Sequence, residues 1–277
     1  MERLTRIKPI LGTYVTISVA AEATREKLIE VTEAGYKEIQ KIHDLMSFHE
    51  SNSEITRINL GAYKRPIQIS TDTLKVINTA LEIGKISDGT FDISCGGVLV
   101  KEKKLPDHGF IFNDESNWKD IQLVENKISF TRPLIIDVSG IAKGYAVDKA
   151  HEYIECMLSD FGDRTEICIN AGGDLKQTPW QNKQVKIKEL WSRSDSEHCV
   201  NMLDSCLATS SGEHDSMIIK NGKNICKETK SVSVFASSCM IADALTKVLY
   251  TEPMAPIRFP KYKNCLIIEN GKEKWLR

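Results

Sequence analysis

Residues Leu134 to Asp148 read LIIDVSGIAKGYAVD. A short run of apolar, β-branched residues ends at Asp137, two glycines flank Lys143, and a segment of helical periodicity follows. This order predicts a strand, a tight turn and the N-terminus of a helix. Unpaired backbone N–H groups and a lysine at such a junction offer a site for an anion such as phosphate, although similar junctions also arise for purely structural reasons. Asp137 stands where a carboxylate can accept a hydrogen bond or hold a metal ion.

The segments on either side of this stretch predict further strands and a second glycine turn. We expect a hairpin at Ile121–Val124 and Lys127–Phe130 before it, and a helix over residues 142–159 after it. The segment Ile167–Asp174, ICINAGGD, then has the pattern of a strand that ends in two glycines. It is the second strand–glycine junction with a carboxylate beside it.

The N-terminal third predicts one strand and three helices. Met46 and Phe48, at the edge of a polar loop, either complete the core or flank a planar ligand. Ser51 or Ser53 is suited to cap the short helix that follows this loop, since its hydroxyl can accept from free backbone N–H groups. The expected elements are a half-buried strand at Leu11–Val19 and helices at Thr24–Met46, after Ser53, and from Ser70 to about Ser87.

The C-terminal half predicts several strands around one apolar helix. This helix, Met240–Leu249, carries Asp243 in its expected first turn, where the helix dipole favours a carboxylate. Strands and helices do not alternate regularly, so an α+β fold is favoured over a doubly wound sheet. The expected strands are Val185–Ile187, Ser205–Thr209, Met217–Ile219, Ser231–Ala236, Ile257–Phe259 and Cys265–Glu269, the last followed by a turn at Asn270-Gly271.

The bulk composition is ordinary for a soluble globular protein. The chain has 277 residues, 41% hydrophobic and 27% charged, with a formal net charge of −1. This balance gives no electrostatic basis for nucleic acid or an anionic membrane as the main partner. No apolar run approaches the roughly 18 residues that span a bilayer.

The N-terminus and the cysteines favour a cytoplasmic location. Residues 1–9 have neither the apolar region nor the cleavage site of a secretory signal. The eight cysteines are widely spread and form no Cys-x-x-Cys pair. We therefore expect reduced thiols rather than disulfides, a zinc ribbon or a thioredoxin-type site.

Taken in order, several of these segments resemble the ApbE family, the FAD:protein FMN transferases. The resemblance covers most of the chain, and its longest motif is the stretch quoted first. It implies a single domain over residues 1–277 with an α+β, T-fold-related architecture of mixed, largely antiparallel sheets packed with helices. The motifs are Gly12-Thr13, Met46-Ser47-Phe48, Ser53-Glu54-Ile55, Gly89-Thr90-Phe91-Asp92, Asp137–Asp148, Asn170–Asp174, Ala208-Thr209-Ser210 and Ala242-Asp243-Ala244-Leu245.

The resemblance also implies a reaction and a set of site residues. Family members bind FAD and Mg²⁺ and pass FMN to a Ser or Thr hydroxyl of an acceptor flavoprotein, releasing AMP. By position, the metal would be held by the carbonyl oxygen of Gly140 and the carboxylate of Asp243. Asp243 and Lys143 would be the catalytic residues, because the metal ion held by Asp243 neutralises charge on the pyrophosphate and Lys143 adds a positive point charge there. The FAD contacts carried over in this way are Met46, Thr90, Phe91, Asp92, Asp137 and Lys143.

The sequence differs from the family pattern at three places that bear on whether it transfers FMN. Lys247 stands at the metal-binding position of a family Thr, where it would either repel Mg²⁺ or replace it as a counter-charge to phosphate. The family segment His-x-x-Asp-Pro-x-Thr-Gly is not found, and His214 either supplies an imidazole nearby or lies exposed in a loop. After Asp92 the chain reads ISCGG instead of the usual Pro and aromatic, Gly-rich stretch. Two alternatives to transfer therefore stay open: an FAD-binding carrier or assembly factor without transferase activity, and an FAD pyrophosphatase.

Overall fold

The computed structural model describes most of the chain as two compact units, and each unit is treated by itself below. The first unit comprises Met1–Lys41, Lys143–Ile218 and Cys226–Arg277, and the second comprises Ile42–Ala142 and Ile219–Ile225. The expectation of a single domain stays a prediction. The described residues are 1–162, 164–188, 197–212, 218–220, 223–224, 230–253 and 264–276.

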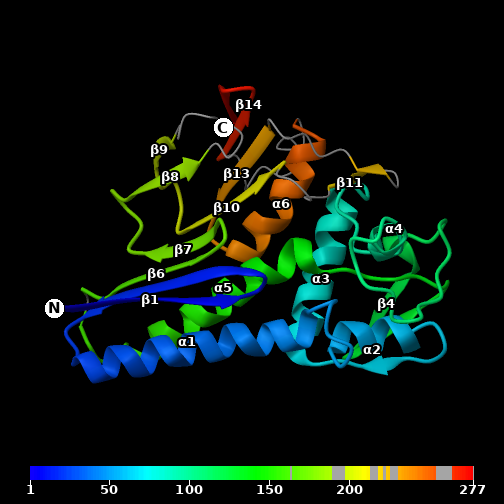
Figure 1. Cartoon of the computed structure of the whole chain (residues 1–277), viewed down its shortest axis with the longest axis horizontal. Helices are drawn as coiled ribbons and strands as arrows, with labels where there is room; N and C mark the ends of the chain where they lie inside the picture. The colour runs from blue at the N-terminus through cyan, green and yellow to red at the C-terminus, as the bar shows by residue number, and fades with distance from the viewer. Residues whose placement is uncertain are drawn as a thin grey trace. The chain divides into compact units, whose positions relative to one another are not determined.

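An eight-stranded sheet forms the centre of the first unit (Figure 1). Its strand order is β1-β2-β6-β7-β10-β13-β14-β15, and every neighbouring pair is antiparallel. This arrangement agrees with the predicted α+β class with largely antiparallel sheets. The strands are β1 (Glu2–Ile10), β2 (Thr13–Ala21), β6 (Glu166–Ala171), β7 (Asp174–Thr178), β10 (Cys206–Ser211), β13 (Lys230–Ala236), β14 (Cys265–Glu269) and β15 (Lys272–Leu276).

Three helices pack on one face of this sheet: α1 (Arg25–Met46, in this unit up to Lys41), α5 (Ser139–Met157, from Lys143) and α6 (Cys239–Thr251). Gly35 of α1 lies against Ile17 of β2 and Ile154 of α5. The hydroxyl of the buried Tyr36 donates to the carbonyl oxygens of Arg6 and Val15, 2.7 and 3.2 Å away. The apolar face predicted for this long helix is thus the core of the unit.

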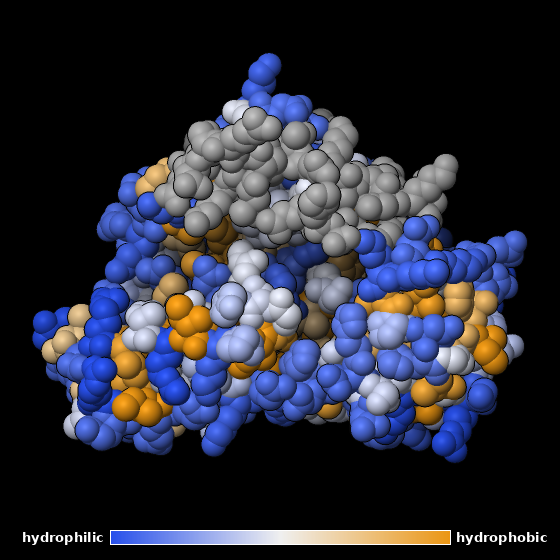
Figure 2. Space-filling view, in the orientation of Figure 1, coloured by the Kyte–Doolittle hydropathy of each residue, from blue (hydrophilic) through white to orange (hydrophobic). Residues whose placement is uncertain are grey.

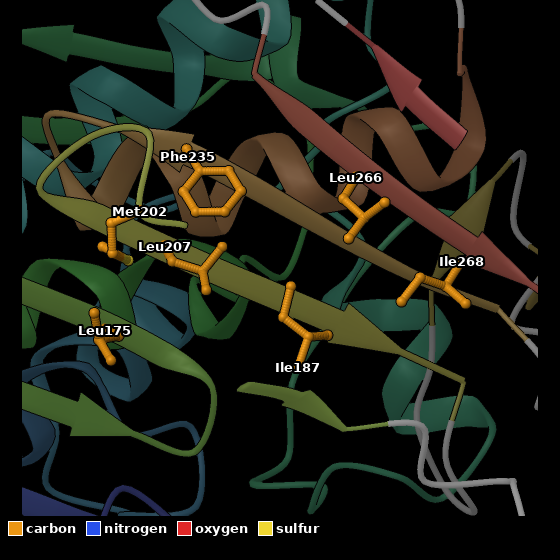
Figure 3. Close-up of a cluster of buried hydrophobic side chains, with 7 residues drawn as sticks. All are labelled: Leu175, Ile187, Met202, Leu207, Phe235, Leu266 and Ile268. Carbon is orange, nitrogen blue, oxygen red and sulfur yellow. The ribbon is translucent and has the colours of Figure 1, made fainter. Parts of the chain in front are cut away.

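The opposite face of the sheet carries a second hydrophobic cluster, drawn in Figure 3. Strands β7, β10, β13 and β14 contribute to it, together with the separate hairpin of β8 (Gln184–Lys188) and β9 (Glu197–Asn201). Alternate residues of each strand point to opposite faces, so the sheet separates this cluster from the helices. The cluster consists of Leu175, Ile187, Met202, Leu207, Phe235, Leu266 and Ile268.

The second unit combines the long helix α3 (Thr71–Ile86) and shorter helices with a three-stranded sheet of order β3-β5-β4. Ser53 and Ser70 cap two of its helices by accepting from backbone N–H groups, at 3.1 and 3.2 Å, as the sequence predicts. The elements are α2 (Glu54–Gly61), β3 (Ile67–Gln68), α3 (Thr71–Ile86), α4 (Gly96–Lys101), the 3₁₀ helix η1 (Trp118–Asp120), β4 (Ile121–Val124), β5 (Lys127–Phe130) and the short pair β11 (Ile219–Lys220) and β12 (Lys223–Asn224).

The strand and tight turn predicted for the Leu134–Asp148 stretch are wrong. Residues 134–138 are buried, but among the described residues they form a single bridge, between Ile135 and Cys95, and the N–H of Asp137 donates to the carbonyl oxygen of Ile93 at 2.8 Å. The side-chain amide of Asn59 satisfies Ile136 instead, accepting from its N–H and donating to its carbonyl oxygen, both at 2.9 Å. A side chain thus replaces a neighbouring strand. Helix α5 begins at Ser139, so both glycines of the motif lie inside the helix.

Other boundaries differ because local patterns were weak. The strand predicted at Leu11–Val19 begins two residues later in the structure, at Thr13. Leu11 and Gly12 have positive φ angles of 60° and 68° and form the turn between β1 and β2. Strands β1, β3, β7, β9 and β12, helix α4 and the 3₁₀ helix η1 were not predicted. Met217 and the predicted strand Ile257–Phe259 lie outside the described residues.

Two bulk expectations can be compared with the structure. The seven described cysteines are all free thiols. No helix within the described ranges is long and apolar enough to cross a membrane. The face shown in Figure 2 is mainly hydrophilic, with hydrophobic residues scattered in small groups.

Candidate functional site

Asp148 of α5 holds the N-terminus of α6. Its carboxylate accepts from the backbone N–H groups of Cys239 and Met240, at 3.1 and 3.0 Å. It also accepts from Ser238 Oγ at 2.8 Å and pairs with Lys176 Nζ of β7 at 2.9 Å. The first N–H groups of a helix have no partner inside the helix, so a carboxylate there stabilises it. The start of α6 is therefore fixed by α5 and β7.

Gly144 allows α5 to approach the start of α6 closely. A Cβ atom at Gly144 would lie 2.3 Å from the carbonyl oxygen of Cys239 and 2.8 Å from the nitrogen of Met240. No side chain fits at this separation, which explains a glycine in a helix despite its cost of about 1 kcal/mol relative to alanine. The backbone N–H of Gly144 then donates to Asp243 Oδ2 at 3.2 Å. The α5 backbone thereby holds a carboxylate of α6.

Every oxygen of Asp243 has a partner within the chain. Asp243 is fully buried, and its Oδ1 forms an ion pair with Lys247 Nζ. Its carbonyl oxygen accepts from Thr246 Oγ1 at 2.6 Å and from Lys247 Nζ at 3.0 Å. The expectation of Asp243 in the first helical turn is wrong, because α6 already starts at Cys239. Contacts with α5 and with its own helix, rather than the helix terminus, hold this carboxylate.

Asp174 and Lys143 form a second buried pair beside Asp243. Lys143 Nζ donates to Asp174 Oδ2 at 2.5 Å, whereas Asp174 Oδ1 is buried with no hydrogen-bond partner among the described atoms. Asp174 opens β7 directly after Gly172 and Gly173, whose φ angles of 61° and 103° suit the tight β6–β7 turn. The second glycine junction of the sequence thus delivers a carboxylate to the site.

Burial and the neighbouring charges shift the pKa values of Asp174 and Lys143. Burial raises the pKa of Asp174 to about 7, and the nearby Asp243 carboxylate contributes in the same direction, against the lowering effect of Lys143 and Lys247. Burial alone would lower the pKa of Lys143, but the carboxylates of Asp174 and Asp243 outweigh it, so that this pKa is raised. Lys143 is therefore cationic at neutral pH, whereas burial and the neighbouring Asp243 make ionisation of Asp174 less favourable than that of an exposed aspartate.

Asp137 and Gly140 belong to the second unit. Asp137 is buried and accepts from the N–H and the Oγ of Ser139, at 3.1 and 2.6 Å. These bonds shape the entry into α5, which suits the structural interpretation of Asp137 and leaves its ligand role a prediction. Gly140 lies in the first turn of α5.

The other predicted FAD contacts also lie in the second unit. Asp92 Oδ1 accepts from the N–H and Oγ of Ser94, at 2.8 and 2.7 Å, and burial raises the pKa of Asp92. Phe91 is buried, and Thr90 is half-buried in the turn after α3. Met46 is buried in the core, as the core interpretation predicts.

Phe48 is buried as well, as the core interpretation of this pair of side chains predicts. Its ring lies 5.5 Å from that of Phe110 at an interplanar angle of 69°. His108 Nε2 lies 3.1 Å from the carbonyl oxygen of Phe48. His214 lies outside the described residues.

The structure thus brings together three of the predicted site residues in the first unit: Lys143, Asp243 and Lys247. It adds Asp174 and Asp148, to which the sequence reasoning gave no role in the site. A signal for Asp174 existed, since it follows the second glycine junction. For Asp148 the motif alone gave none, because its partners at the start of α6 are about ninety residues away along the chain.

Comparisons with known proteins give consistent results. The model of the ApbE family matches residues 11–258. An FAD:protein FMN transferase of Haemophilus influenzae is 25% identical over 264 residues, which cover 82% of this chain and 73% of the relative. A second FAD:protein FMN transferase, from Vibrio cholerae, is 25% identical over 238 residues, covering 75% of this chain and 69% of the relative.

Solved structures share the fold over the full length. The flavin transferase ApbE from Vibrio cholerae superposes with a TM-score of 0.80 at 22% identity, covering 99% of this chain and 97% of that one. The ApbE protein from Thermotoga maritima gives a TM-score of 0.78 at 20% identity, covering 100% and 97%. These likenesses confirm the α+β architecture expected from the sequence.

Proposed function

The chain belongs to the ApbE family, and from this premise we propose that it transfers FMN from FAD to a protein. In the finer form of the proposal, the acceptor is a Ser or Thr hydroxyl of a flavoprotein and AMP is released. The hydroxyl oxygen bonds to the phosphorus of the FMN half, and the P–O bond to the AMP half breaks. The hydroxyl proton is released to the surroundings. A relative's name supports the flavin substrate, whereas acceptor and products are part of the proposal.

The observation that carries this proposal is the convergence of Lys143, Asp174, Asp243 and Lys247 from distant segments of the chain. Lys143 and Lys247 are held in place by buried carboxylates. Two fixed ammonium groups suit the diphosphate of FAD, and they stabilise the negative charge that develops on the departing AMP phosphate. Asp243 and Asp174 act here by positioning the lysines.

The remaining predicted contacts complete the proposal on the flavin side. By resemblance, Met46, Thr90, Phe91, Asp92 and Asp137 contact FAD. Asp92 and Asp137 keep their carboxylates fixed through Ser94 and Ser139, which is compatible with an ordered binding surface.

The resemblance implies a magnesium ion with Gly140 and Asp243 as ligands. Whether Asp243 can serve depends on whether its oxygen atoms are free to coordinate the ion. Mg²⁺ takes hard oxygen ligands in octahedral geometry and is repelled by a neighbouring ammonium group. Both carboxylate oxygens of Asp243 are already bonded, to Lys247 and to Gly144. No group of three or more His, Cys, Asp or Glu residues that could hold a metal occurs among the described residues. The residues at Asp243 do not fit the ion, and no step is assigned to it.

A transfer assay tests the proposal. FAD and an acceptor flavoprotein or its Ser/Thr peptide are incubated with the protein, and covalent FMN and AMP are measured by mass spectrometry and chromatography. We expect equimolar flavinylated acceptor and AMP, and a loss of at least about 100-fold in Asp243→Ala and Asp243→Asn, as for other charge-stabilising sites. Glu155→Gln, an exposed acid-to-amide change on α5, is the matched control and should retain activity.

Three outcomes would contradict the proposal. Robust transfer by a folded Asp243→Ala protein would remove this site from the reaction. Free FMN and AMP without a modified acceptor would identify an FAD pyrophosphatase. Bound FAD without AMP release would identify a flavin carrier or assembly factor, the alternative that Lys247 motivates.

A further inference from the structure

The two lysines form the accessible part of the charge cluster in the first unit. The side chains of Asp174 and Asp243 are 1% and 0% exposed, whereas those of Lys143 and Lys247 are 27% and 25% exposed. A ligand arriving from solvent therefore meets lysine side chains before it meets a carboxylate. This order suits an anion better than a cation.

Lys247 is held at Asp243 by the geometry of helix α6. The two residues are four apart, so their side chains lie on the same helix face. The ammonium group contacts two oxygens of Asp243, the carboxylate Oδ1 and the carbonyl oxygen, the latter at 3.0 Å. Thr246, one position earlier, turns to the sheet instead, where its Oγ1 lies 2.6 Å from Ser210 Oγ. Lysine, not threonine, thus faces the carboxylate.

The cluster is electrically balanced without a metal ion when its groups carry their usual charges. Two carboxylates, Asp174 and Asp243, face two ammonium groups, Lys143 and Lys247. A divalent cation added at Asp243 would place two further positive charges directly beside the ammonium group of Lys247 in a largely buried place, which is strongly unfavourable. It would also have to displace Lys247 from Oδ1, leaving that ammonium group without its partner.

We propose that the ammonium group of Lys247 occupies the position at Asp243 that a divalent cation would otherwise take, and excludes that cation. Together with Lys143, it presents an anion site for the diphosphate of the substrate. The second statement rests on the proposed function, whereas the exclusion of a divalent cation does not.

Binding of Mn²⁺ tests the exclusion directly, because the free ion has an electron paramagnetic resonance signal that disappears on binding. The full-length protein is titrated with Mn²⁺, alongside Asp243→Asn, Lys247→Thr, Lys247→Arg and the double variant Lys247→Thr/Asp243→Asn. We expect no Asp243-dependent binding by the wild type or by Lys247→Arg, which keeps the charge. Lys247→Thr should bind Mn²⁺ at least about tenfold more tightly than the wild type, and the double variant should lose this gain.

Each other result overturns the proposal. Binding by the wild type that Asp243→Asn abolishes would show that the lysine does not exclude the ion. Absence of binding in both the wild type and Lys247→Thr would show that the lysine is not what keeps the ion out. Circular dichroism spectra establish that Lys247→Thr is folded, and Lys247→Met serves as a second neutral variant.

A second measurement separates this inference from the proposed function. FAD binding, followed by flavin fluorescence in EDTA and in excess Mg²⁺, should agree within about twofold for the wild type and differ at least about tenfold for Lys247→Thr. A wild type that needs Mg²⁺ to bind FAD would overturn the anion-site statement. If the protein excludes Mn²⁺ but does not transfer FMN, the exclusion of the divalent cation stands and the proposed function is wrong.

Discussion

Replacement of Asp148 by alanine should destabilise the first unit strongly, although Asp148 was not predicted to touch a ligand. Its carboxylate is buried and holds the N-terminus of α6 through Cys239 and Met240. It is also the ion-pair partner of Lys176, whose side chain is only 14% exposed. Burial lowers the pKa of Lys176, but Asp148 more than compensates, so that this pKa is raised. Removing Asp148 therefore leaves a largely buried ammonium group without its partner.

The magnitude follows from these two losses. Breaking a buried ion pair by removing one partner costs about 3–5 kcal/mol, and loss of a helix cap costs about 1 kcal/mol. The terms overlap, so we expect a decrease of roughly 4 kcal/mol in the free energy of unfolding, against a total of about 5–15 kcal/mol for a typical protein. Asp148→Asn should cost less, because the amide oxygen still accepts from the backbone.

Urea denaturation followed by far-ultraviolet circular dichroism measures this effect. Asp148→Ala is compared with Lys176→Met and with the double variant, which removes both charges. We expect the double variant to be more stable than the sum of the single changes predicts, with a coupling energy of about 2–3 kcal/mol. A loss below about 1 kcal/mol for Asp148→Ala, or additive single changes, would refute this account of how α6 is held.

Two further predictions concern the packing and the pH dependence of the same unit. Gly144→Ala should cost about 1–3 kcal/mol and reduce flavin transfer, because its Cβ would lie 2.3 Å from the carbonyl oxygen of Cys239. Thermal unfolding and the transfer assay check this, and Glu155→Ala, a change at an exposed position of the same helix, is the control that should leave transfer unchanged. Burial, assisted by Lys176, lowers the pKa of His151 from 6.5 to about 4, so the folded state resists a proton that the unfolded state accepts. The stability that this residue contributes is present above pH 6.5 and is lost as the pH falls through 4. His151→Gln should therefore make the free energy of unfolding, measured with urea, fall less steeply between pH 6.5 and 4. An unchanged pH dependence would contradict this prediction.

Local patterns sufficed for the long helices and for the caps. The apolar periodicity of α1 and α3 and the serines before α2 and α3 act within a few residues, where sequence and structure are closely linked. The same reasoning failed at residues 134–138, because the side-chain amide of Asn59, more than seventy residues away, bonds to the backbone of Ile136 where a neighbouring strand would pair. It also failed for β1, whose half-exposed alternation at the sheet edge carries little apolar signal.

The sequence by itself determined the family of this protein, its α+β class, and most of the residues that could carry its chemistry. The tertiary structure decided what those residues do to one another. Asp243 is paired with Lys247, and Asp174 joins Lys143. The physical reason is that a motif specifies which groups are available, whereas charge balance and burial depend on groups brought together from distant segments. At Asp243 that balance is reached with lysine.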